Sequence, residues 1–286
     1  MGIVSLEYRV PAVDLQPYVT LFYHFVADVP LFDDLERADH AQLRFRLNTG
    51  GEASYRFADG TEQTVPCGHI VGPTSGVLRT IAEGPLEVIG MGLQPAGWHA
   101  LFGIDASVML NRAMDASRLL GADVVADACS EMLSAEGTDA KVAVAEALVR
   151  RSIAQRDDDS LAFAAAIDAW LAKARSPAID DLVAVCGLSR RQVERRTKAL
   201  YGVPPKVLAR KYRALRTAVA LAGGAATELA LADGGFYDQS HLIRELKQFT
   251  GLTPRQMHDE PGLLAQLTIQ NRRALEGKVH LIISDT

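Results

Sequence analysis

Hydrophobic and polar residues alternate along much of the first hundred positions of this chain. The alternation has period two at 42–47 (Gln-Leu-Arg-Phe-Arg-Leu) and at 53–57 (Ala-Ser-Tyr-Arg-Phe), which is typical of β-strands with one buried face. Aromatic and β-branched runs at 18–26, 77–81 and 86–93 are separated by Gly and Pro. We therefore predict a region rich in β-strands up to about residue 95, folded as a small barrel or sandwich.

The segment between the two alternating runs has the composition of a tight turn. It reads Asn-Thr-Gly-Gly from Asn48 to Gly51, and such residues favour the positive backbone angles of hairpin turns. This pattern predicts a hairpin that joins 42–47 to 53–57.

The hydrophobic period changes from two to that of a helix after Gly97. Stretches rich in Ala and Leu at 115–134, 139–155 and 160–174 are predicted to be amphipathic helices, separated at Gly137 and by the cluster Asp157 to Ser160, which can cap the last of them. These helices either cover the barrel or form a dimer interface, and the sequence leaves both roles open. The segment Lys-Ala-Arg-Ser-Pro at 173–177 then marks a junction.

A helix, a turn with Gly and a second, more polar helix occur twice after the junction, at 178–200 and 226–250. In the first unit, Gly187 is suited to end the leading helix, and Ser189 is predicted to cap a helix from Arg190 to Leu200. The polar face of that second helix is dense in Arg. An Arg-rich helix of this kind fits the major groove of DNA, where guanidinium groups bind guanine and phosphates.

The second unit has the same layout with different residues. We expect Thr227 to cap its leading helix, Phe236 to fill the corner and Asp238 to cap the helix 239–250. A linker helix from Pro205 to about Ala222 is predicted between the units. Its eighteen residues would span about 27 Å, which is comparable with the roughly 34 Å between successive major-groove faces of B-DNA.

Charge is divided unevenly along the chain. Residues 175–258 carry 14 Lys and Arg against 7 Asp and Glu, whereas residues 1–174 carry 13 against 24, so the overall net charge of −5 hides a basic C-terminal third. A polyanionic partner is therefore plausible for that third alone.

Other features exclude several classes of protein. There is no apolar run of about 18 residues and no signal-like N-terminus, so we expect a cytoplasmic protein without membrane contact. Cys67, Cys129 and Cys186 lack metal-site spacing and are expected to be reduced, and neither neighbour of Cys67 in the sequence would activate its thiol. No metal site is expected from the scattered histidines, and no enzymatic motif or cofactor-binding motif is present.

The segment GGFYDQSHLIRELKQFTGLTPRQMH, Gly234 to His258, resembles the signature of the AraC/XylS family of bacterial transcription regulators. CGLSRRQVERRTKALYGVPP fits the corresponding pattern of the first unit, and the resemblance covers about residues 160–258. PAVDLQPYVTLFYHF and GPTSGVLRTI are similar in outline to a cupin-like N-terminal half found in one subgroup. The implied fold class is α+β, with an N-terminal cupin-like barrel, following helices, and a C-terminal all-α domain of two helix-turn-helix units.

By this resemblance, the second helix of each unit faces bases. The implied base-facing residues are Arg190, Arg191, Glu194 and Arg195 in the first unit and Gln239, Ser240, His241 and Arg244 in the second, while Lys198 and Lys247 would approach phosphates. Three positions depart from the family pattern. Thr197 replaces a buried Phe, Leu246 replaces an aromatic residue, and Glu245 stands where a basic residue is common.

The resemblance implies a sequence-specific transcription regulator whose partner is double-stranded DNA. It leaves open a small-molecule effector, a homodimer and, for an activator, contact with RNA polymerase. The expected domains are 1–158 for effector binding or oligomerisation, 159–260 for DNA binding and 261–286 as an extension of unassigned role. The alternatives are a protein-interaction module or a cupin-type enzyme fused to a basic helical domain.

Overall fold

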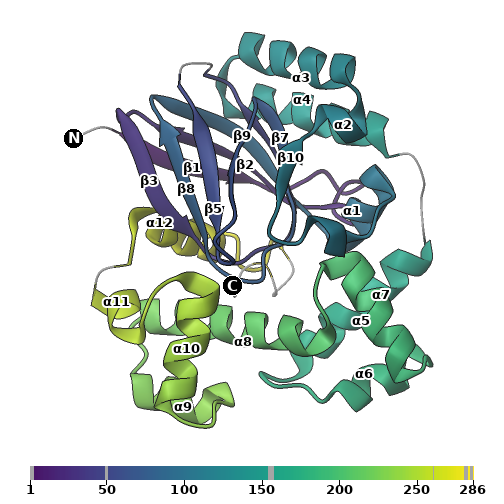
Figure 1. Ribbon diagram of the computed structural model, residues 1–286, viewed down its shortest axis with the longest axis vertical. Coiled ribbons are helices and arrows are strands. Elements are labelled where there is room, and N and C mark those ends of the chain that lie inside the picture. The colour runs from purple at the N-terminus through teal and green to yellow at the C-terminus, as the bar shows by residue number, and fades with distance from the viewer. Residues whose placement is uncertain (1–2, 49–50, 154–157, 260, 280–282, 284–285) are drawn as a thin grey trace.

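The N-terminal part of the protein is built from two antiparallel β-sheets that face each other, and the C-terminal helices lie along one end of them (Figure 1). The computed structural model describes residues 3–48, 51–153, 158–259, 261–279, 283 and 286. A β-rich half followed by two helix-turn-helix units confirms the predicted α+β class.

One sheet has six strands in the order β1-β2-β9-β4-β7-β10, and the other has four in the order β3-β8-β5-β6. The strands are β1 (Val4–Arg9), β2 (Val19–Ala27), β3 (Leu31–Glu36), β4 (Gln42–Arg46), β5 (Ala53–Phe57), β6 (Glu62–Thr64), β7 (Gly68–Val71), β8 (Leu78–Glu83), β9 (Leu86–Leu93) and β10 (Ala113–Asp115). Apolar side chains from both sheets, among them Phe25, Phe32 and Phe57, pack together between them. In β5 the apolar residues of the alternation face this core, whereas Leu43 and Phe45 of β4 face a second core on the outer side of the six-stranded sheet.

The predicted hairpin between 42–47 and 53–57 is wrong. β4 pairs with β9 and β7, whereas β5 pairs with β8 and β6. Both edges of β4 are therefore already taken, and the chain crosses to the opposite sheet between the two strands. Thr49 and Gly50 lie outside the described residues.

The helices of the described residues all begin at or after Pro95. They are α1 (Pro95–Phe102), the 3₁₀ helix η1 (Ala106–Met109), α2 (Ser117–Leu120), α3 (Ala122–Ser134), α4 (Gly137–Ser152), α5 (Asp158–Lys173), α6 (Ile179–Cys186), α7 (Arg190–Tyr201), α8 (Pro205–Ala222), α9 (Thr227–Gly234), α10 (Gln239–Thr250), α11 (Pro254–Asp259) and α12 (Leu263–Arg273). Among the described residues, no helix is long and apolar enough to cross a membrane.

Two features of the region after residue 95 differ from the prediction. The short strand β10 lies within what the sequence suggested was helical, because three residues are too few to show an alternation. The predicted helix 115–134 is split into α2 and α3 at Gly121, whose φ of 94° no helix can accommodate. Asp157, part of the predicted cap of the last helix, lies outside the described residues.

Helices α3 and α4 cover the outer face of the six-stranded sheet (Figure 1). Their buried residues, including Met132 and Leu148, belong to the same core as Phe45 and Ile89 of the sheet. Of the two roles that the sequence left open, α3 and α4 show the covering one, whereas α5 packs with the first helix-turn-helix unit. Dimerisation stays a prediction.

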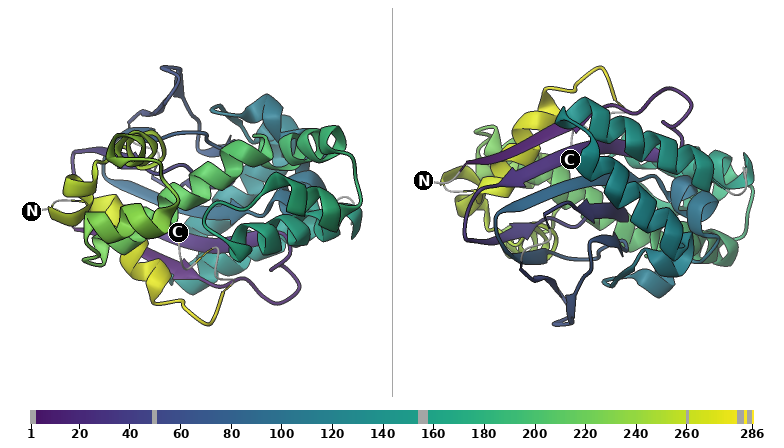
Figure 2. Two further views of the ribbon diagram at one scale, coloured as in Figure 1. Left: turned by 90° about the horizontal axis from the view of Figure 1, so that it is seen from below. Right: turned by 90° about the horizontal axis from the view of Figure 1, so that it is seen from above.

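Helix α8 crosses beneath the sheets with one helix-turn-helix unit at each end (Figures 1 and 2). The first unit packs with α5 around Ile167, Leu182 and Val193, and the second packs around Leu242 and Leu246. The chain then turns back, and α12 lies against β1 and β3. The predicted linker helix and its bounds are thereby confirmed.

Candidate nucleic-acid interface and cavity

The first helix-turn-helix unit has the local geometry that its sequence predicts. Gly187 ends α6 in the left-handed conformation with φ of 62°, a conformation that residues with a side chain rarely adopt. The side chain of Ser189 then accepts a hydrogen bond from the backbone N–H of Gln192, and the Gln192 side chain accepts one from the backbone N–H of Ser189. This capping box fixes where α7 begins.

One face of α7 is open to solvent and the other is packed. The exposed residues are Arg190, Arg191, Glu194, Arg195 and Lys198, all candidates from the sequence. Val193 is buried, and so is Thr197, whose hydroxyl donates to the Val193 carbonyl oxygen at 2.8 Å. Because that hydroxyl is satisfied, Thr197 replaces the expected aromatic residue without an unpaired polar group.

The second unit differs from the prediction at the start of its first helix. The cap of α9 is Ala226 and has no side-chain hydrogen bond, so the expected capping role of Thr227 is wrong: Thr227 is already the first helical residue. Asp238 does cap α10, because its carboxylate accepts a hydrogen bond from the His241 backbone N–H at 2.7 Å. Phe236 is buried at the corner.

Helix α10 exposes most of the candidate residues. Gln239, Ser240, Arg244 and Lys247 are exposed. His241 is partly buried. Its Nδ1 accepts a hydrogen bond from the Tyr237 N–H at 3.2 Å, and its Nε2 lies 3.1 Å from a carboxylate oxygen of Glu245. Its ring is thus oriented by its own helix. A base contact by any of these residues stays a prediction.

Glu245 anchors α10 to α8 and leaves only 1% of its side chain exposed. It accepts hydrogen bonds from Arg210 at 2.6 Å and from Arg213 at 2.7 Å. Burial alone would raise the pKa of Glu245, but the two guanidinium groups hold it below its usual value. The acidic residue at this family-atypical position is therefore a packing anchor.

Much of the positive charge on α8 is used inside the protein. Besides Arg210 and Arg213, Lys211 is buried and donates to the Asp39 carbonyl oxygen at 3.2 Å, and Arg216 donates to the Leu171 carbonyl oxygen at 2.8 Å. The basic patch open to solvent is therefore concentrated on α7 and α10.

A cavity of about 130 Å³ lies between the two sheets and extends toward α8 and α12. Its walls are mostly apolar and include side chains from both sheets and from the C-terminal helices. Examples are Phe25, Phe32, Val88, Leu215, Met257 and Leu264. A small molecule in this space would therefore touch both halves of the chain.

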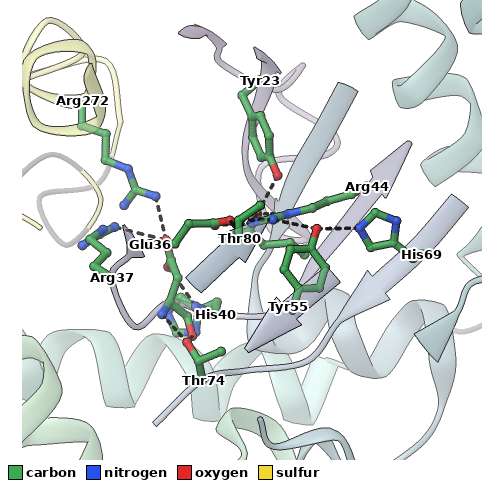
Figure 3. A network of polar contacts seen from close by, with 12 residues as sticks. Tyr23, Glu36, Arg37, His40, Arg44, Tyr55, His69, Thr74, Thr80 and Arg272 are labelled. Carbon is green, nitrogen blue, oxygen red and sulfur yellow. Dashed lines mark hydrogen bonds and ion pairs between the residues drawn. The ribbon is translucent and has the colours of Figure 1, made fainter. Parts of the chain in front are cut away.

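The polar wall of the cavity is a connected hydrogen-bond network (Figure 3). Arg44 donates to Glu36 at 2.9 Å and to the Tyr55 hydroxyl at 3.0 Å, and that hydroxyl donates in turn to His69 Nε2 at 2.8 Å. Thr80 also donates to Glu36. Burial would raise the pKa of Glu36, but Arg44 holds it below the usual value, while burial lowers the pKa of His69 to about 3. The network therefore holds an ion pair beside a neutral imidazole.

Large aromatic residues of the β-rich half divide into two groups according to their surroundings. Tyr23, Phe25 and Tyr55 line the cavity, whereas Phe22 and Trp98 belong to the core on the other side of the six-stranded sheet. The sequence reasoning did not identify Glu36 and Arg44. The alternation gives no signal for Arg44, because this residue stands on the polar side of β4 and its partners Glu36 and Tyr55 come from other strands.

The loop between β3 and β4, residues 37–41, contacts several C-terminal helices. The Ala38 N–H donates to the Phe249 carbonyl oxygen of α10 at 2.7 Å, Asp39 pairs with Arg272 of α12 at 2.9 Å, and His40 bonds the Tyr212 hydroxyl of α8. Burial would raise the pKa of Asp39, but Arg37 and Arg272 hold it well below its usual value. We call residues 37–41 the coupling loop.

Helices α7 and α10 also touch the β-rich half where they end. A Cβ atom on Gly202, after α7, would lie 2.6 Å from Pro73, and one on Gly251, after α10, would lie 2.8 Å from Leu35. Both glycines have positive φ. The second helix of each unit therefore contacts the β-rich half at its C-terminal end, which is the end opposite its capped N-terminus.

Within the part of the chain that the structure describes, no three His, Cys, Asp or Glu side chains gather in a way that could hold a metal ion. His24 contacts Thr138 and Glu87, and His40 and His69 bond tyrosine hydroxyls.

Comparisons with solved structures give several crystal structures of ToxT from Vibrio cholerae. ToxT of strain O395 is 11% identical with a TM-score of 0.43, covering 81% of this chain and 99% of that one. Wild-type ToxT of strain SCE256 bound to an unsaturated fatty acid is 10% identical with a TM-score of 0.46, covering 86% and 95%. ToxT bound to a methylnaphthalenyl butenoic acid is 10% identical with a TM-score of 0.41, covering 89% and 97%. No curated protein sequence gives a significant match.

The family comparison concerns the C-terminal part of the chain. Residues 182–260 match the family described as a helix-turn-helix domain. The match begins in α6, includes both capped units and α8, and ends just after α11. Together with the geometry above, it identifies residues 182–260 as an AraC-type helix-turn-helix domain, the kind of domain that DNA-binding transcription regulators carry.

Proposed function

We propose that this protein is a sequence-specific transcription regulator that inserts α7 and α10 into successive major-groove segments of DNA. The single observation that carries the proposal is the presence of two capped helices with exposed polar faces, one at each end of the eighteen-residue helix α8. Bidentate side chains on such faces read base edges, and Lys side chains contact phosphates.

The proposed base contacts are those of the exposed faces. They are Arg190, Arg191, Glu194 and Arg195 on α7 and Gln239, Ser240, His241 and Arg244 on α10, with Lys198 and Lys247 toward phosphates. His241 has to give up its contact with Glu245 or read DNA from its present orientation.

Selection of bound sequences from a random DNA pool tests this function. We expect one enriched motif with two elements about 10 base pairs apart, and its preference over unrelated DNA should survive added salt. Recovery of DNA without a motif, with binding that salt removes entirely, would show a contact by charge alone and overturn the proposal.

We further propose that a small ligand in the cavity modulates DNA binding. The support is that the cavity is lined by Glu36 and by α12 residues, while the coupling loop, which directly follows Glu36, bonds α8, α10 and α12. We also propose the domain boundaries 1–158, 159–260 and 261–286. The packing of Phe163 and Ile167 of α5 with the first unit supports the first of these boundaries.

Ala82→Leu tests the ligand half of the proposal. Ala82 is buried on β8 and lines the cavity, so the larger side chain fills space that a ligand needs. We expect a metabolite fraction that raises the melting temperature of the wild type to leave the variant unchanged, while the variant still binds the selected DNA. Equal stabilisation of both proteins would place the ligand elsewhere.

A further inference from the structure

Two cysteines that lie far apart in the sequence meet on the surface opposite the helix-turn-helix units. Cys67 precedes β7, and Cys129 lies on α3, which covers that strand. Their sulfur atoms are 3.0 Å apart, and both side chains are half-buried. Neither residue contributes to the DNA-binding surface.

The close approach of α3 to β7 follows from Gly68. A Cβ atom at this position would lie 2.4 Å from Val125 Cγ1, so only glycine lets the helix pack this near. Val125 and Cys129 are four residues apart and share one face of α3. Contact at Gly68 therefore brings Cys129 onto the neighbouring Cys67.

The hydrogen bonds assign different roles to the two thiols. Cys67 Sγ lies 2.8 Å from the Arg46 carbonyl oxygen, to which its S–H donates, and this leaves the sulfur free to accept from the Cys129 thiol. The donated hydrogen bond from Cys129 lowers the pKa of Cys67 and the Arg46 charge adds to that effect, whereas the pKa of Cys129 is raised. A thiolate at Cys67 would accept the Cys129 S–H at this 3.0 Å contact, so we assign Cys67 as the nucleophile and Cys129 as its partner.

We propose that Cys67 and Cys129 form a peroxide-reactive site that closes to an intramolecular disulfide. The Cys67 thiolate attacks the terminal oxygen of a hydroperoxide: the S–O bond forms, the O–O bond breaks, and the leaving oxygen departs as an alcohol or as water after taking a proton. Cys129 then attacks the Cys67 sulfenic sulfur, the S–S bond forms, and the hydroxyl leaves as water with the Cys129 proton. Two thiols and one hydroperoxide thus give one disulfide, one alcohol or water molecule, and a further water.

Little movement is needed for the second step. The sulfur atoms have to approach from 3.0 Å to the roughly 2.05 Å of a disulfide bond. The bond would join the start of β7 to the middle of α3. The third cysteine, Cys186, lies on α6 in the helix-turn-helix half and serves as an internal reference.

Differential alkylation with mass spectrometry tests the site in the full-length reduced protein. After brief exposure to hydrogen peroxide, we expect a loss of two hydrogen atoms and one non-reduced peptide pair that contains Cys67 and Cys129, while Cys186 stays alkylated. Cys186→Ser should behave like the wild type. Cross-links between chains, or disulfides to Cys186 instead, would overturn the proposal.

Two further variants separate the nucleophile from its partner. In Cys129→Ser, Cys67 should stop at the sulfenic acid and be trapped by dimedone at least about tenfold faster than Cys186. In Cys67→Ser, Cys129 should give no dimedone adduct. Circular dichroism confirms that each variant is folded, and equal labelling of Cys67 and Cys186 in folded Cys129→Ser would refute the assigned roles.

Discussion

The backbone N–H of Ala38 donates a 2.7 Å hydrogen bond to the carbonyl oxygen of Phe249. Carbonyl groups in the last turn of a helix have no partner within the helix, so an outside donor fixes the position of that end. Here the donor is part of the coupling loop, and Val77 makes a similar bond to the Gln248 carbonyl oxygen at 2.9 Å. The C-terminal end of α10 is therefore seated on the β-rich half.

The first prediction concerns the exposed arginines. Arg195→Ala and Arg244→Ala should each weaken binding to a selected DNA site by about 1–3 kcal/mol, because each removes a side chain suited to a base contact. Arg118→Ala is the matched control, since Arg118 is also exposed but lies on α2. Titration by fluorescence anisotropy measures the affinity for the DNA site. If all three variants weaken binding equally, the arginines act through general electrostatics and not through base contacts.

A second prediction concerns the anchor between α8 and α10. Glu245→Ala leaves the charge of the buried Arg213 without its carboxylate partner and should lower the free energy of unfolding by about 3–5 kcal/mol. Glu228→Ala, at an exposed site on α9, should change it by less than about 0.5 kcal/mol.

The effect of Glu245 should also depend on pH. Its pKa is lower in the folded state, so its stabilising contribution is present above the unfolded value near 4.5 and is lost as pH falls through the folded value. Urea denaturation should therefore show that the difference in free energy of unfolding between the wild type and Glu245→Ala becomes smaller below pH 4.5. If this difference stays constant down to strongly acidic pH, the ion pair does not contribute to stability as we expect.

The third prediction concerns Asp168, whose pKa is shifted in the opposite direction to that of Glu245. Asp168 lies on α5 beside the Tyr201 hydroxyl, and burial raises the pKa of its carboxyl group to about 7. The unfolded chain releases this proton near pH 3.8, so the folded state is penalised as pH rises above that value. Asp168→Asn should hence increase the free energy of unfolding at pH 8 and change it little at pH 3.5. A destabilising effect at pH 8 would rule out this account.

The fourth prediction concerns α12. Asp39→Ala removes the carboxylate that Arg272 and Arg37 share, so α12 loses its charged anchor to the coupling loop. Hydrogen exchange of residues 263–273 should accelerate in this variant. Asp59→Ala breaks an exposed pair with Arg112 and should leave that exchange unchanged. Unaltered protection of α12 in Asp39→Ala would show that its other contacts, such as the packing of Leu264 and the Asn271 hydrogen bond to the Leu6 carbonyl oxygen, are enough to hold it.

The helices of the DNA-binding half could be predicted closely because their signals are local. Gly187, Ser189 and Asp238 act within one turn of their own positions, and the structure places each as expected. The linker helix follows in the same way from Pro205. Local hydrogen bonding decides these boundaries, and tertiary contacts only stabilise them.

The cavity and the sheet pairing could not be predicted because they depend on residues distant in the sequence. Neighbouring strands β4 and β5 belong to different sheets, and the partners of Arg44 come from β3 and β5. Cys67 likewise meets Cys129 only because Gly68 lets a helix pack close. A single sequence shows which residues alternate but not which strands pair.

The coupling loop is held at its two ends by strands of different sheets, β3 and β4. Any widening or narrowing of the space between the sheets therefore displaces one end of residues 37–41 relative to the other. Ala38, Asp39 and His40 pass that displacement directly to α10, α12 and α8. The route from the cavity wall to α10, the helix proposed to read DNA, is thus only a few covalent bonds and one hydrogen bond long, and it needs no helix to melt or re-form.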